Sequence, residues 1–330
     1  MKILVTVPFR KQHKAMLKEA VPDAQFFFQE SYLSEPGGKK DEERYKALLK
    51  EAEIVIGNPT IEEVASAPSL KFVQSSNAGV EKYTQIPGFP RNVLLCSMSG
   101  AFGGIISEYV VGAVLMMYRN FPRYIEHQQK RLWQDVGSEQ ALMGKTALIL
   151  GTGDIGTNVA KRLKAFDVYT IGIRRTLSKA SEWFDEVWTI DSLDEQLLRA
   201  DLVIGCLPKT QQTTHLLTED RLSKIKQSGL IVNVGRGSLI VQPDLIKLLE
   251  EGHLSGAVLD VTDPEPLQKD NPLWGMKNVL ITPHVSGISF GHDPQVEDNI
   301  AKICVHNLKA YLNHTEMWNV VDFESGYRKE

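Results

Sequence analysis

The glycine-rich run Gly151-Thr152-Gly153-Asp154-Ile155-Gly156 constrains the fold more than any other feature of this sequence. An apolar segment, residues 145–150, stands directly before it, and Val159, Ala160 and Leu163 follow it at helical spacing. A second apolar segment comes next. This order predicts a strand, a tight turn and a helix at the start of a doubly wound parallel sheet.

Each glycine of the run has a physical role in such a unit. Gly151 permits the tight turn, Gly153 lets the backbone approach a phosphate, and Gly156 lets the helix pack closely on the strand. The free N–H groups and the dipole of the helix N-terminus attract an anion. We therefore predict that the run, including Asp154 and Ile155, holds the pyrophosphate of a nicotinamide dinucleotide. An ordinary glycine-rich turn is the alternative.

The length of 330 residues fits two domains better than one. Short apolar runs alternate with helix-compatible segments on both sides of a continuous apolar stretch near residues 107–118, a pattern typical of α/β domains. We predict a discontinuous, flavodoxin-like α/β domain from residues 1–98 with 286–330. A Rossmann-type dinucleotide-binding domain is predicted at residues 99–285.

The apolar runs predict the strands of both sheets, and the segments between them predict the helices. For the first domain these are strands 3–7, 24–28, 54–57, 72–75 and 93–96, with helices 11–20, 41–52 and 297–312. For the second they are strands 145–150, 168–173, 202–206, 230–234, 256–260 and 279–281, with helices 107–118, 157–166, 194–200 and 242–251.

Composition narrows the functional class. A formal net charge of −4 does not favour nucleic-acid binding, which normally needs a basic surface. No apolar stretch is long enough to span a bilayer, and the N-terminal segment lacks the pattern of a signal peptide, so no membrane association is expected. The separated Cys96, Cys206 and Cys304 are interpreted as buried free thiols in a reducing cytoplasm.

Two further residue types are given structural interpretations. No paired ligand spacing links the histidines His13, His127, His215, His253, His292, His306 and His314, and no metal is expected. Trp133 and Trp274 are interpreted as packing residues rather than as parts of a cofactor site.

The end of the strand after the glycine run bears on cofactor choice. An acid that binds the ribose 2′-hydroxyl of NAD should stand about 20 residues beyond the run, and Arg174, Arg175 and Thr176 occupy that place. Two guanidinium groups and a hydroxyl can bind a 2′-phosphate, which a carboxylate would repel. NADP(H) is therefore predicted over NAD(H), with solvated arginines and a loose preference as the alternative.

Three ionisable residues follow other strands of the same predicted sheet. Arg236, Glu265 and His284 each come after a strand end, where ligands bind in open α/β sheets. Reduction of a 2-keto acid needs a cation for the substrate carboxylate and an acid for the nascent alkoxide. Arginine supplies a permanent bidentate cation, and histidine exchanges a proton near neutral pH. A carboxylate bonded to the imidazole, here Glu265, would stabilise its charged form. Each of the three residues alone is more often structural or solvated.

With these motifs, the sequence resembles the D-isomer-specific 2-hydroxyacid dehydrogenase family over nearly its whole length. The matching stretches are Gly151–Gly156, Leu207–Thr210, Asn233–Gly237, Asp260–Leu267 and Pro283–Gly287. The resemblance implies that Arg236, Glu265 and His284 form the catalytic set, with His284 as acid/base.

The resemblance also implies further contacts. Cofactor contacts are expected from Leu207, Pro208, Thr213, Val234 and Asp260, the last at the nicotinamide end. Substrate contacts are expected from Asn77, Ala78, Gly79 and Val80, whose backbone N–H groups could bind the carboxylate. By the same resemblance, the domain of residues 1–98 with 286–330 is the substrate (lid) domain, and the helix near residues 107–118 belongs to a homodimer interface. Two departures stand out: Arg174 replaces the acid usual in NAD-using members, and Thr262 replaces an aromatic residue.

The leading hypothesis is an NADPH-preferring reductase of small 2-keto acids, such as glyoxylate or hydroxypyruvate, that yields the D-2-hydroxy acid. A non-catalytic, dinucleotide-sensing protein like the corepressors of this fold is a rival, and so is an NAD-preferring D-2-hydroxyacid dehydrogenase. Formate oxidation is disfavoured because it needs no proton from His284.

Overall fold

The computed structural model describes residues 1–29, 42–137, 139–176, 181–288, 290 and 293–328. The chain divides into two compact units. Unit 1 contains residues 1–102 and 288–330, and unit 2 contains residues 103–287. These boundaries lie a few residues beyond the boundaries 98/99 and 285/286 expected from the sequence.

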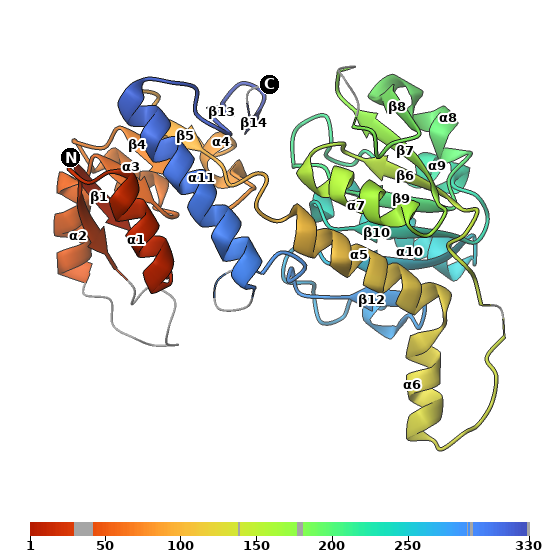
Figure 1. Cartoon of the computed structure of the whole chain (residues 1–330). Helices are drawn as coiled ribbons and strands as arrows, with labels where there is room; N and C mark the ends of the chain where they lie inside the picture. The colour runs from red at the N-terminus through yellow and green to blue at the C-terminus, as the bar shows by residue number, and fades with distance from the viewer. Residues whose placement is uncertain (30–41, 138, 177–180, 289, 291–292, 329–330) are drawn as a thin grey trace. The chain divides into compact units, whose positions relative to one another are not determined.

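In the described part of unit 1, five parallel strands form one sheet in the order β2-β1-β3-β4-β5 (Figure 1). They are β1 (Lys2–Val5), β2 (Gln25–Phe28), β3 (Ile54–Ile56), β4 (Phe72–Gln74) and β5 (Leu94–Cys96). The order is that of the flavodoxin-like doubly wound fold. Because both faces of a parallel sheet are covered, its central strand β3 is a continuous apolar run that is fully buried.

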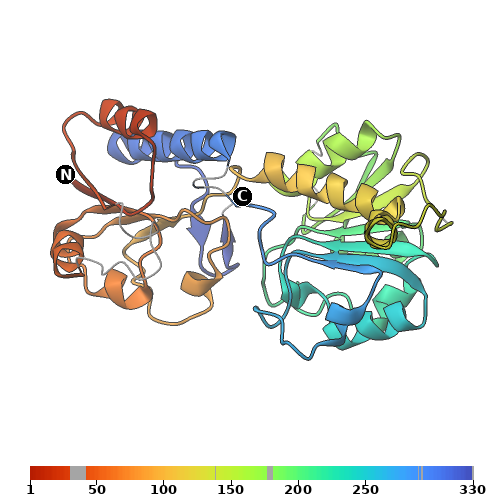
Figure 2. The same ribbon diagram turned by 90° about the horizontal axis from the view of Figure 1, so that it is seen from below.

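Helices cover both faces of this sheet (Figure 2). On one face α1 (Lys11–Ala20) packs against α11 (Pro294–Asn313). On the other, α2 (Glu42–Glu51), α3 (Ile61–Ala65) and α4 (Glu81–Thr84) contribute Tyr45, Leu49, Val64 and Tyr83 to a common core. A short hairpin of β13 (Val321–Asp322) and β14 (Tyr327–Arg328) follows α11.

The described part of unit 2 contains a second parallel sheet, of seven strands in the order β12-β11-β10-β9-β6-β7-β8. Its strands are β6 (Thr146–Leu150), β7 (Tyr169–Arg174), β8 (Glu186–Thr189), β9 (Leu202–Gly205), β10 (Gly229–Asn233), β11 (Leu254–Leu259) and β12 (Val279–Ile281). The strand order reverses between β6 and β9, and this Rossmann-type switch point is where dinucleotides bind.

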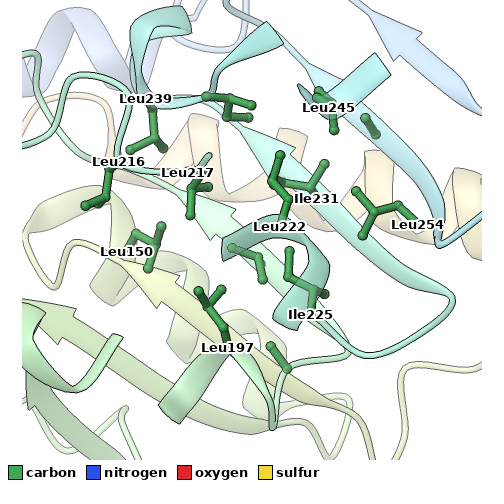
Figure 3. Close-up of a cluster of buried hydrophobic side chains, with 14 of the residues drawn as sticks. Leu150, Leu197, Leu216, Leu217, Leu222, Ile225, Ile231, Leu239, Leu245 and Leu254 are labelled. Carbon is green, nitrogen blue, oxygen red and sulfur yellow. The ribbon is translucent and has the colours of Figure 1, made fainter. Parts of the chain in front are cut away.

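The unit 2 sheet also lies between two helical layers (Figure 2). On one face are α5 (Gly103–Tyr118) and α7 (Asp154–Lys164), which pack together. On the other are α8 (Leu193–Leu197), α9 (Glu219–Lys224) and α10 (Gln242–Glu250). Figure 3 shows leucine and isoleucine side chains of these three helices meeting those of β6, β10 and β11 in one core. The 3-10 helices among the described residues of unit 2 are η2 (Ile190–Ser192), η3 (Gly237–Leu239) and η4 (Pro272–Gly275).

The predicted doubly wound α/β architecture is confirmed, but several local expectations differ from the structure. Helix α7 begins at Asp154 rather than Thr157, because Gly153 serves as its N-cap and the acidic Asp154 suits the first turn. Helix α5 begins at Gly103 rather than Ser107. Strand β8 was not predicted, because it is a half-buried edge strand without a clear apolar pattern.

The interpretation of Trp133 and Trp274 as packing residues is wrong for the single chain. Trp133 is fully exposed and Trp274 is more than half exposed. Trp133 follows α6 (Phe121–Gln129), a helix with no buried residue that stands away from the unit 2 sheet (Figure 1). The sequence could not reveal the exposure of these two side chains, because the apolar character of a tryptophan does not show whether other residues pack against it.

Candidate active site

The glycine run lies at the switch point of the unit 2 sheet, between the ends of β6 and β9. Gly151 has φ +107°, and a Cβ there would lie 3.2 Å from the carbonyl oxygen of Cys206. At Gly156 a Cβ would lie only 1.8 Å from the carbonyl oxygen of Gly151. The tight turn and the close helix–strand contact that a dinucleotide loop needs are therefore both present. The first N–H groups of α7 begin directly after Gly153, so these residues fit a bound pyrophosphate.

Asp154 has a structural role that the sequence did not predict. Its Oδ2 accepts the N–H of Gly103 at 2.8 Å, and its Oδ1 accepts the side-chain amide of Asn158 at 3.1 Å. The carboxylate therefore joins the N-terminus of α5 to the start of α7. A contribution of Asp154 to cofactor binding would come most readily through its backbone.

The residues predicted for cofactor selectivity stand at the end of β7, two strands from the end of β9. Arg174 is the last residue of β7 and is half-buried, whereas Arg175 and Thr176 are exposed. No carboxylate occurs among these three residues. This strand end thus presents cations and a hydroxyl where an NAD-specific site presents an acid.

Local hydrogen bonds shape the loops after β9 and β10. The Thr213 hydroxyl donates to the carbonyl of Pro208 at 2.6 Å, which folds the segment after Leu207 back on itself. The Asn233 side chain accepts the N–H of Gly235 at 3.1 Å and donates to the carbonyl of Arg236 at 2.8 Å. These bonds fix the backbone from Val234, which is buried, to Arg236.

Strand register brings the predicted catalytic residues to one edge of the sheet. Asn233 at the end of β10 pairs with Leu259 of β11, and Leu259 pairs with Ile281 of β12. The segments that carry Arg236, Glu265 and His284 therefore leave three adjacent parallel strands at the same edge. This is the edge at which ligands bind in such sheets.

Glu265 and His284 are joined by a direct hydrogen bond in this structure. Glu265 Oε2 lies 3.0 Å from His284 Nδ1, and both side chains are partly exposed. Glu265 Oε1 accepts the backbone N–H of Thr262 at 3.2 Å, so the carboxylate is held from both sides. With Nδ1 beside Glu265, Nε2 is the ring nitrogen that can exchange a proton with a ligand. Having threonine at position 262 instead of the family's aromatic residue does not affect this contact with Glu265, because the donor is the backbone N–H of Thr262.

Asp260 is buried and organises the turn that carries His284. Its Oδ1 accepts the Thr282 hydroxyl at 2.6 Å and the Val285 N–H at 2.9 Å, and its Oδ2 accepts the Ser286 N–H at 3.0 Å. The carbonyl of Asp260 accepts the His284 N–H at 2.8 Å. The sequence predicts only a cofactor contact for Asp260, because these hydrogen bonds leave no local pattern in it.

The loop predicted to bind the substrate carboxylate lies in unit 1, after β4. The Asn58 side chain donates to Ser76 Oγ at 2.7 Å and to Asn77 Oδ1 at 3.2 Å. Its carbonyl oxygen accepts the Ser75 hydroxyl at 2.8 Å and the Ser76 N–H at 3.2 Å. Asn58 thus ties the start of the loop to the end of β3, a role that no sequence pattern predicts.

Within the described residues, neither a metal-binding cluster nor a membrane-spanning helix is present. No group of three or more His, Cys, Asp or Glu within those residues could hold a metal ion, and His292 lies outside them. No helix in the described part of the chain is both long and apolar enough to cross a membrane.

A doubly wound sheet with a dinucleotide loop and an Arg/Glu/His set at its ligand-binding edge defines a nicotinamide-dependent dehydrogenase. The sequence model of the "D-isomer specific 2-hydroxyacid dehydrogenase, NAD binding domain" matches residues 111–286. The chain belongs to the D-isomer-specific 2-hydroxyacid dehydrogenase family, whose members are oxidoreductases.

Individual relatives agree with this assignment. The chain is similar to a family member of known structure from Aeromonas salmonicida, with a TM-score of 0.82, 34% identity and 98% and 99% of the two chains covered. A glyoxylate reductase from Thermofilum pendens is 30% identical over 76% of this chain and 74% of its own. An NADPH-dependent glyoxylate/hydroxypyruvate reductase from Sinorhizobium meliloti, solved with NADP and sulfate, has a TM-score of 0.80, 27% identity and 99% of each chain covered.

Proposed function

We propose that this protein is an NADPH-preferring reductase that converts small 2-keto acids, of the glyoxylate or hydroxypyruvate type, into D-2-hydroxy acids. The observation that carries the proposal is the His284–Glu265 pair, 3.0 Å apart, at the ligand-binding edge of the sheet that bears the glycine run. Relatives with glyoxylate reductase and glyoxylate/hydroxypyruvate reductase activity support the substrate class.

The proposed mechanism assigns one task to each side chain. The nicotinamide cofactor, when bound, supplies a hydride for C2 of the keto acid. Arg236 orients the substrate carboxylate and polarises the ketone, as a permanent bidentate cation can. Protonated His284 gives its Nε2 proton to the ketone oxygen, and Glu265 holds the imidazole through Nδ1 in the required orientation.

In unit 1, the proposed substrate contacts lie in the loop after β4. The backbone N–H groups of Ala78, Gly79 and Val80 are assigned to the substrate carboxylate, with Asn77 beside them. The hydrogen bonds from Asn58 to Ser76 give the start of this loop a fixed backbone. A preorganised set of N–H donors binds a carboxylate without losing free energy to loop ordering.

The proposed NADPH preference rests on Arg174, Arg175 and Thr176. A guanidinium group bonded to the 2′-phosphate is a charge-assisted contact, and such bonds contribute about 1.5–3 kcal/mol. NADPH is the bound cofactor of a family structure from Xanthobacter autotrophicus with a TM-score of 0.80 and 26% identity. NAD remains usable in this proposal, with lower efficiency.

The assay for the reaction follows NADPH consumption across a panel of 2-keto acids. His284→Ala should lower kcat by about 10²–10⁴-fold, the range that general acid–base catalysis contributes. The acid/base assignment is wrong if His284→Ala keeps most of the activity. A wild-type protein that reduces no 2-keto acid, yet binds NADPH tightly, would favour the dinucleotide-sensing alternative.

Cofactor preference is tested by charge reversal at the end of β7. Arg174→Asp should lower the ratio of kcat/KM for NADPH to that for NADH by about a hundredfold, because a charge-assisted bond is replaced by repulsion. Lys11→Asp, an exposed residue in the first turn of α1, makes the same change in net charge and should leave the ratio unchanged. A wild-type preference for NADH of tenfold or more would contradict the proposal.

The proposed assembly is a cytoplasmic homodimer. Helix α6, which has no buried residue, exposes Phe121 and Ile125, and the loop after it exposes Leu132 and Trp133. Exposed apolar clusters of this kind mark protein–protein contacts. A second copy of the chain is the proposed partner, with α5 in the same interface. Three unpaired cysteines suit the proposed reducing compartment.

A further inference from the structure

A chain of two hydrogen bonds links α5 to the turn that carries His284. Tyr109 Oη lies 2.7 Å from Thr282 Oγ1, and Thr282 Oγ1 lies 2.6 Å from Asp260 Oδ1. A carboxylate only accepts hydrogen bonds, so the single hydroxyl proton of Thr282 points to Asp260. Tyr109 must therefore be the donor to Thr282, so both hydrogen bonds are donated in the same direction, from Tyr109 toward Asp260.

Tyr109 is suited to remain a donor. Burial raises the pKa of its hydroxyl to about 12, so the group keeps its proton at physiological pH. Tyr109 lies on α5, a 16-residue helix that packs against α7. A rigid element thus supplies the first member of the chain. The hydroxyl of Thr282 is held in one rotamer because it has a donor on one side and an acceptor on the other.

The turn that receives this support holds His284 in an unfavourable backbone conformation. His284 has φ +56°, in the left-handed region that costs free energy for a residue with a Cβ. Such a conformation persists only when its surroundings determine it. Here the buried Asp260 carboxylate binds the turn at Thr282, Val285 and Ser286, on both sides of His284.

We propose that Tyr109 is a positioning residue for His284, acting through Thr282 and Asp260. By orienting the Thr282 hydroxyl, Tyr109 keeps all three bonds of the Asp260 carboxylate in place, and these bonds hold the imidazole beside Glu265. The inference rests on the proposed role of His284 as the proton donor. It predicts an effect on the rate of the chemical step rather than on the binding of substrate or cofactor.

The first test removes only the hydroxyl. Tyr109→Phe should lower kcat about tenfold, the upper range for the loss of one neutral hydrogen bond, and change KM for NADPH and for the keto acid less than twofold. It should also increase the solvent deuterium isotope effect on kcat, because proton transfer from a misplaced His284 becomes more rate-limiting. Tyr118→Phe is the matched control, since Tyr118 is also on α5 and donates at 3.4 Å to the carbonyl of Asp201, outside the site.

A double-mutant cycle separates positioning from general stability. Thr282→Val removes the link itself and should lower kcat more than Tyr109→Phe, whereas Thr282→Ser keeps the hydroxyl and should retain most of kcat. The double variant Tyr109→Phe/Thr282→Val should be no slower than Thr282→Val alone, because Tyr109 acts through Thr282. Additive losses, a kcat of Tyr109→Phe within twofold of wild type, or equal losses in Tyr118→Phe would overturn the proposal.

Amide hydrogen exchange gives a readout that does not depend on catalysis. In Tyr109→Phe the N–H groups of Val285 and Ser286, which donate to Asp260, should exchange several-fold faster than in wild type and in Tyr118→Phe. Unchanged exchange would overturn the positioning role. If the wild-type protein reduces no 2-keto acid but exchange accelerates as expected, the proposed function fails while the structural chain stands.

Discussion

Replacing Gly156 by alanine tests the cofactor loop most directly. A Cβ at this position would lie 1.8 Å from the carbonyl oxygen of Gly151 and 3.0 Å from its carbonyl carbon. A real Cβ does not come closer than about 3.0 Å to such an atom, so helix α7 and the loop must separate by roughly 1.2 Å. Both obstacles are backbone atoms, and no side-chain rotation can relieve the overlap.

The expected cost follows from this geometry. Overpacking of a well-packed site costs about 1–3 kcal/mol, and a backbone obstacle places Gly156→Ala at the upper end. For a unit the size of residues 103–287, about 3 kcal/mol corresponds to a fall in Tm of roughly 6–12 °C. The N–H groups at the start of α7 also move, so the affinity for NADPH should fall at least tenfold.

The assay is thermal unfolding with and without NADPH, together with a Kd from titration. Gly104→Ala is the matched control, since Gly104 is also helical, in α5, and a Cβ there meets nothing within 4 Å. Alanine is the better helix former, so this control should keep or slightly raise Tm. A Gly156→Ala protein with the Tm and the NADPH affinity of wild type would refute the argument.

Three further predictions concern other parts of the chain. Hydrogen bonds from Arg199, Tyr169 and Trp188 lower the pKa of Glu186 to about 2. Glu186→Gln should therefore lower the free energy of unfolding, measured by urea titration at each pH. The full loss is expected above about pH 4.5, and a progressively smaller loss toward pH 2. Burial raises the pKa of Cys96 to about 12 and also raises the pKa of Cys304. Neither thiol should therefore react with a disulfide reagent at pH 8 until the protein is unfolded. Fast reaction of the native protein would contradict their burial. Trp133→Ser should shift sedimentation toward the monomer without changing the secondary structure, and an unchanged dimer would place the interface elsewhere.

Much of the fold could be predicted from local sequence patterns. Buried parallel strands are continuous apolar runs, and the strand at residues 279–281 was predicted with the bounds that β12 has in the structure. Edge strand β8 and the exposed helix α6 lack such a pattern, and neither was predicted. Helix starts were also misplaced, because they depend on cap geometry as well as on periodicity.

For the site, the sequence placed the residues but not their partners. Arg236, Glu265 and His284 each follow a strand of one parallel sheet, so their shared edge followed from the strand assignments alone. That Glu265 faces His284 Nδ1, and that the Thr262 N–H holds the other oxygen of Glu265, depended on loop conformation. No spacing rule encodes these contacts.

The sequence by itself was enough to identify the glycine run, the arginines at the end of β7 and the residues that follow the strand ends. These features are properties of short segments with a fixed periodicity. Only the tertiary structure decided which groups those residues contact. Tyr109 reaches Thr282 across 173 positions of the chain, and Asp260 holds the turn around His284. Such contacts depend on how α5 packs on the unit 2 sheet and on the rotamer of each side chain, and packing between distant segments leaves no local pattern in the sequence.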